Sequence, residues 1–118
     1  MIFDEITLRL KEGTTIPKPE AKEAFKIKGL GKRREEKALI YYIPNHKNPD
    51  KPYQKGITAS EFETAYQQIT NNGEFSRTWF NENLSECANE GGCNFTTIGG
   101  IFELLDLAEY KPGKYVKK

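Results

Sequence analysis

The sequence predicts a single α+β domain, residues 1–118, in which a helix and a basic β-hairpin precede three helices and a C-terminal β-hairpin. Three observations predict this class. Residues 25–43 hold two segments of strand-like composition on either side of a glycine-bearing basic loop. Residues 57–110 hold three apolar stripes with helical spacing, each preceded by a capping residue. Residues 109–116 place a proline–glycine turn between two short segments that suit strands.

Residues 2–12 allow two interpretations. Ile6, Leu8 and Leu10 alternate as in a strand, whereas Phe3, Ile6 and Leu10 lie on one helical face. Gly13, with cations just before it, is typical of a helix end, so the sequence favours a helix here.

The first hairpin is predicted from residues 25–28 and 38–43, with Gly29-Leu30-Gly31 as a turn signal. Residues 45–54 hold two prolines and two asparagines, which predicts a loop. This loop is the candidate boundary between a subdomain of residues 1–56, containing the helix and basic hairpin, and a second subdomain of residues 57–118.

The three helices of the second subdomain have recognisable ends. A capping box begins the first, serine and threonine caps begin the others, and glycines end the first two. The residues that carry these signals are Thr58 and Glu61, Gly73, Ser76, Gly91 and Gly92, and Thr96. The third helix is expected to bury Ile98, Ile101, Phe102 and Leu105, which follow one face.

Residues 57–118, with three helices and then a hairpin ending in lysines, resemble the winged helix-turn-helix family in pattern and order. The resemblance implies that the third helix enters the major groove and that the hairpin wing touches the DNA. It would turn toward DNA the residues Asn94, Thr96, Thr97, Gly100 and Glu103, with Lys111 and Lys114 in the wing. However, residues 57–110 carry nine carboxylates and one cation, Arg77, so phosphates are repelled. The sequence therefore favours a winged fold that serves protein contacts or acts as a scaffold.

The basic hairpin is the stronger candidate for nucleic-acid contact. Glycines beside Lys32, Arg33 and Arg34 suit a loop that follows phosphates, and Tyr41 and Tyr42 offer stacking faces. The predicted nucleic-acid-binding residues are Lys28, Lys32, Arg33, Arg34, Lys111 and Lys114. The competing interpretation is an ordinary solvated turn, because Glu35 and Glu36 partly neutralise the loop.

The sequence thus predicts a small non-enzymatic accessory or regulatory protein that acts through macromolecular contacts, with weak, non-specific nucleic-acid binding. One alternative is a small hydrolase or nuclease that uses Glu35, Lys37 and His46. Another is a dimerising protein-interaction scaffold with an acidic helical face. No metal or other cofactor is expected, since Cys87 and Cys93 with one distant histidine do not make a zinc ligand set.

The expected compartment is the cytoplasm. The longest apolar run, residues 38–43, is too short to cross a bilayer. The first residues do not resemble a secretory signal, and the two cysteines fit reduced thiols. The expected partners are therefore nucleic acid, another protein or a second copy of the chain, and not a membrane.

Overall fold

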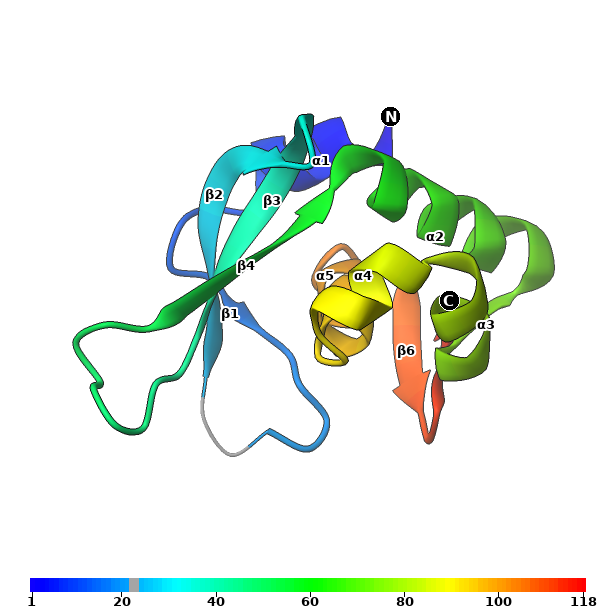
Figure 1. Cartoon of the computed structure of the whole chain (residues 1–118). Coiled ribbons are helices and arrows are strands. Elements are labelled where there is room, and N and C mark those ends of the chain that lie inside the picture. The colour runs from blue at the N-terminus through cyan, green and yellow to red at the C-terminus, as the bar shows by residue number, and fades with distance from the viewer. Residues whose placement is uncertain (22–23) are drawn as a thin grey trace.

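A computed structural model describes residues 1–21 and 24–118 of the chain (Figure 1). The described part confirms the α+β class, with five helices and two antiparallel sheets in a body of 41 × 30 × 26 Å. Among the described residues, no helix has both the length and the apolar composition needed to cross a bilayer.

The first half of the chain forms a helix and a four-stranded sheet. The elements are α1 (Ile2–Arg9), β1 (Thr15–Ile16), β2 (Phe25–Arg33), β3 (Glu36–Ile43) and β4 (Tyr53–Thr58), with strand order β1-β2-β3-β4. The helical interpretation of the N-terminal segment is confirmed, because α1 buries Ile2, Phe3 and Ile6 on one side.

The predicted position of the first turn is wrong. Gly29 and Gly31 lie inside β2, and the chain reverses at Arg34 and Glu35, whose φ angles of 50° and 62° suit a tight hairpin turn. Gly29 instead takes a φ of 142° where the pairing of β2 with β3 shifts register. Glycine adopts this backbone conformation without strain. Gly29 therefore marks a β-bulge within the strand and not the turn that was predicted.

The second half begins directly after β4, without an intervening loop. It comprises α2 (Ala59–Asn72), β5 (Glu74–Ser76), α3 (Arg77–Asn83), α4 (Ser85–Glu90), α5 (Asn94–Leu104), β6 (Ala108–Lys111) and β7 (Lys114–Lys117). The capping box of Thr58 and Glu61 is present, Gly73 ends α2 with a φ of 82°, and the Ser76 hydroxyl accepts from the Trp79 amide at 3.1 Å. The expected start and end of α2 and the expected start of α3 are therefore confirmed.

Three details of this half differ from the predictions. The second helix is divided into α3 and α4 at Leu84, which has an extended φ of −123°. The third helix begins at Asn94, and Thr96 uses its hydroxyl to bond back to the Cys93 carbonyl at 3.2 Å. The C-terminal hairpin does not join the first hairpin: its strand β7 pairs with β5, a three-residue strand that is too short to show a period in the sequence.

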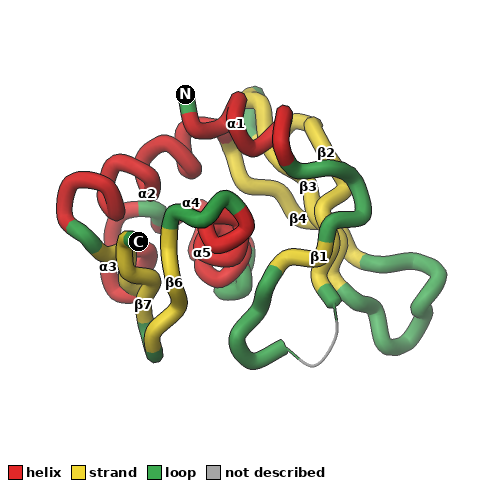
Figure 2. Tube along the Cα trace, turned by 180° about the vertical axis from the view of Figure 1, so that it is seen from behind, coloured by secondary structure: helices red, strands yellow, loops and turns green. Residues whose placement is uncertain are grey.

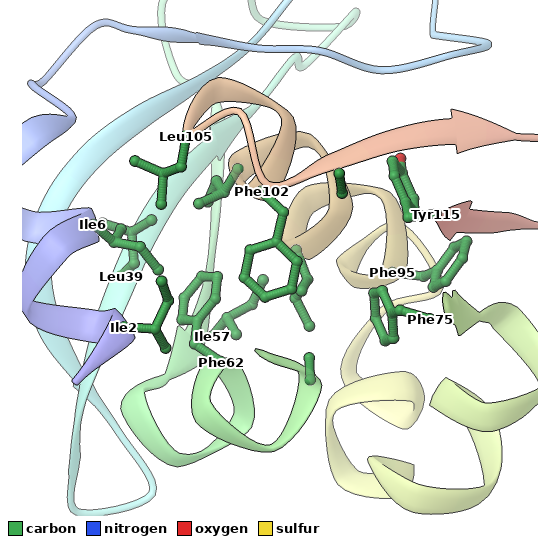
Figure 3. Close-up of a cluster of buried hydrophobic side chains, with 14 of the residues drawn as sticks. Ile2, Ile6, Leu39, Ile57, Phe62, Phe75, Phe95, Phe102, Leu105 and Tyr115 are labelled. Carbon is green, nitrogen blue, oxygen red and sulfur yellow. The ribbon is translucent and has the colours of Figure 1, made fainter. Parts of the chain in front are cut away.

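Helix α5 lies at the centre of the molecule, between the two sheets (Figures 1 and 2). Its predicted face is confirmed, since Ile98, Ile101 and Phe102 are fully buried and Leu105 is nearly so. Figure 3 shows residues from α1, β3 and β4 on one side of Phe102, and aromatic residues of β5, α5 and β7 on the other. The buried side chains form one continuous cluster that joins both halves of the chain.

Candidate nucleic-acid interface

The helix that the resemblance would direct into DNA is buried. Asn94 and Thr97 have no exposed surface, and an added Cβ at Gly100 would lie 2.4 Å from the backbone oxygen of Pro17. Asn94 uses its side chain inside the protein, where its amide donates to the Cys87 carbonyl. The segment around Pro17 thus covers part of the face of α5 that a major-groove contact would need.

Arg34, one of the predicted binding residues, makes ion pairs within the protein. Its guanidinium contacts Glu61 (2.5 Å), Glu86 (3.3 Å) and Glu90, from α2 and α4. Hydrogen bonding to Glu90, with the charges of Glu61 and Glu90, raises the pKa of Arg34 further above its usual value. The Glu61 side chain is only 10% exposed, so this charge needs its counterion. Arg34 therefore joins the hairpin tip to the helices and is not available to phosphates.

Lys26, Lys28 and Arg33 share the side of the sheet that faces away from the helices. In the register of β2, β3 and β4, Lys26 lies opposite Tyr42, and Tyr42 lies opposite Gln54. Lys28 reaches the same row, because its amine donates to the Gln54 side chain at 3.0 Å and lies 6.0 Å from the Tyr42 ring centre. We call this surface, made of Lys26, Lys28, Arg33, Tyr42 and Gln54, the open sheet face.

The two adjacent tyrosines of β3 have opposite roles. Tyr41 points into the core, is fully buried and donates a 2.5 Å hydrogen bond to the Asn94 side chain, so it offers no stacking surface. Tyr42 is half-buried on the open sheet face. The opposite side of the same strands, with Ile27, Leu39 and Ile57, packs on the core, and the helices lie on that side (Figures 1 and 2).

Two glycines keep the open sheet face flat. A Cβ at Gly31 would lie 2.6 Å from Ile40, and one at Gly56 would lie 2.7 Å from the Arg33 side chain and 2.8 Å from Ile40. Because both positions lack a side chain, Ile40 and the stem of Arg33 lie along the strands instead of standing away from them. The guanidinium of Arg33 bonds only its neighbour's carbonyl, that of Lys32, among the described residues.

The remaining predicted residues are not brought together. Lys32 lies opposite Lys37 near the tip of the first hairpin. Lys111 and Lys114 flank the turn of β6 and β7, where they pair with Glu109 (3.7 Å) and Glu74 (2.8 Å). Both views show the two hairpin tips at opposite ends of the molecule (Figures 1 and 2). The wing lysines therefore form no continuous surface with the first hairpin.

The alternative catalytic residues are also separated. Glu35 lies in the hairpin turn, Lys37 is the second residue of β3, and His46 follows the other end of that strand, roughly 20 Å further along. Among the described residues, the hollow beside His46 is lined by Pro44, Asn45 and Pro49, none of which is a carboxylate. Within residues 1–21 and 24–118, no three histidine, cysteine or acidic side chains are grouped as metal ligands.

Comparison with known proteins gives no family for this chain. No family model matches the sequence, and no significant match to a curated protein or to a solved structure was found. The functional argument therefore rests on the geometry of the chain itself.

Proposed function

We propose that this is a non-enzymatic cytoplasmic protein that binds single-stranded nucleic acid, weakly and without sequence preference, through the open sheet face. The observation that carries the proposal is the row of Lys26, Tyr42 and Gln54 across three strands, with the Lys28 amine beside it. Amines next to an aromatic ring on a solvent-facing sheet match the two needs of such binding, which are phosphate neutralisation and base stacking.

The distribution of charge supports this location. Residues 24–56 hold nine Lys and Arg against three Asp and Glu, a net charge of +6. Residues 57–110 hold one against nine, a net charge of −8. Phosphates are attracted to the first region and repelled by the second, so the sheet is the favoured end for a polyanion.

A single strand suits the open sheet face better than a duplex. The face presents one half-buried tyrosine among amines and has no helix or ribbon that protrudes into a groove. An unpaired base has an accessible ring face that can stack on Tyr42, whereas a paired base does not.

In this proposal the second half of the chain is a scaffold of winged-helix character. The order of α2, β5, α3, α4, α5, β6 and β7 supports the resemblance, with β5 as the third strand beside the wing hairpin. The buried α5 fits a role in which the winged unit holds the sheet and does not read bases. Two free thiols, Cys87 and Cys93, fit the reducing cytoplasm.

The test is a titration of a labelled oligothymidine strand by fluorescence anisotropy at several salt concentrations. If binding neutralises about three phosphates, the logarithm of the association constant should fall with the logarithm of the salt concentration at a slope of roughly −2, at about −0.7 per phosphate on single strands. The variant with Lys26→Gln and Lys28→Gln should lose most of that slope. Tyr42→Ala should weaken binding by about 1–3 kcal/mol and leave the slope unchanged, since it removes stacking without removing charge.

The matched control is the double variant Lys111→Gln and Lys114→Gln, which removes two lysines from the opposite hairpin. It should bind like the unchanged protein. Equal loss in both double variants would mean that net charge alone drives binding, and a greater loss in the wing variant would move the interface to the wing. If the protein instead self-associates through its basic sheet and acidic helices, sedimentation at low salt will show dimers and the strand will not bind.

A further inference from the structure

A second feature, separate from the open sheet face, is a cavity of about 400 Å³ where the segment before β2 meets α3 and the wing hairpin. This volume lies in the range of small-molecule sites. Its walls include the rings of Phe25, Phe95 and Tyr110, together with the side chains of Lys18 and Arg77. Glu20 is the carboxylate among the lining residues, and it is exposed.

Lys18 fixes one wall of this cavity. Its amine donates to the Cys93 carbonyl (2.9 Å) and to the hydroxyls of Thr96 (2.9 Å) and Thr97 (2.6 Å), and it lies 4.3 Å from the ring centre of Phe25. Burial lowers the pKa of Lys18 to about 7, partly offset by Cys93 and reinforced by Arg77. Because its three hydrogens are directed to oxygens of the protein, Lys18 shapes the wall more than it binds.

Arg77 supplies the permanent charge. Its guanidinium stacks on Phe95, 4.7 Å from the ring centre, and one nitrogen donates to the Gly92 carbonyl at 3.1 Å. An arginine side chain has five N–H donors, and within the described residues the Arg77 guanidinium makes only this one hydrogen bond. The ring and the carbonyl thus hold the group in place while its other donors remain available.

We propose that this cavity binds a small organic anion that joins one carboxylate or phosphate group to a planar ring. Arg77 contacts the anionic group, and the walls formed by Phe25 and Tyr110 contact the ring. Arg77 is the only cation in the acidic stretch of residues 57–110 and is not part of the open sheet face. Anion binding in this cavity gives it a role.

The test is an NMR titration of ¹⁵N-labelled full-length protein with benzoate and with adenosine 5′-monophosphate, which separate the carboxylate and phosphate classes. Benzamide and adenosine are the neutral controls. An affinity on the order of 1 mM is expected for at least one of the anions. The shifts should be saturable and centred on Phe25, Cys93, Thr96, Tyr110 and Gly113, and the neutral compounds should bind at least tenfold more weakly.

Arg77→Gln should weaken anion binding by about tenfold to a hundredfold, because it removes a charge-assisted contact and keeps a donor for Gly92. Arg9→Gln, an exposed arginine on α1, is the matched control and should bind unchanged. The proposal is overturned by equal binding of neutral and anionic compounds, by shifts centred on the open sheet face, or by no saturable shift. The mapping uses the unchanged protein, so it decides the matter even if Arg77→Gln fails to fold.

Discussion

At the scale of single residues, the hairpin tip shows why cations in a sequence are not equivalent. Lys32, Arg33 and Arg34 are consecutive, but only Arg34 reaches carboxylates on α2 and α4. Its partners lie 27 to 56 residues away in the chain, so no local pattern identifies them. Arg33 lies over Gly56 on the open sheet face. The sequence therefore shows three consecutive cations but does not tell which of them stabilises the structure and which is free to bind.

Arg34→Ala should lower the free energy of unfolding by about 1–3 kcal/mol, because it leaves the Glu61 carboxylate buried without its counterion. Arg33→Ala should cost less than about 1 kcal/mol, since it removes one hydrogen bond to a neighbouring carbonyl. Urea unfolding of both variants at neutral pH measures the difference. Equal costs would show that the carboxylate cluster does not stabilise the fold.

At the scale of elements, the predictions succeeded where the signal was local. The capping box of α2, its glycine end and the buried stripe of α5 depend on residues within one or two turns of each other. Strands β1 and β5, of two and three residues, exist only because distant strands pair with them. The Gly99-Gly100 pair of α5 allows close packing on both sides, with Tyr115 against Gly99 and Pro17 against Gly100.

This close packing predicts that replacing Gly99 with alanine lowers the stability of the protein, the opposite of the usual effect in a helix. On an exposed helix, glycine to alanine stabilises by about 1 kcal/mol. Gly99→Ala should instead destabilise by about 1–3 kcal/mol or more, because its Cβ would lie 2.1 Å from the buried Tyr115 ring. Thermal or urea unfolding measures this, with Thr64→Ala on the exposed side of α2 as the control that should stay within about 0.5 kcal/mol. A stabilised Gly99→Ala protein would mean that α5 does not pack on β7 as described.

At the scale of the whole molecule, the regions of opposite net charge correspond to the two structural halves. Residues 24–56, which form β2, β3 and most of β4, have a net charge of +6, and residues 57–110 of the helical half have a net charge of −8. The sequence predicted this asymmetry and the α+β class, because both depend on composition and order. It could not predict which sheet face is open, since that depends on how α1, α2 and α5 pack together on the other face. The row of Lys26, Tyr42 and Gln54 likewise appears only once the strand register is known.

The central claim is that the open sheet face contacts the nucleic acid, and amide chemical-shift mapping tests it most directly. A short oligothymidine strand is added to ¹⁵N-labelled protein at low salt. The account predicts that the largest shifts occur at Lys26, Lys28, Tyr42 and Gln54 on the open sheet face, and that they disappear as salt is raised. Shifts centred on α5 or on the turn between Lys111 and Lys114, or no shifts at low salt, would contradict it.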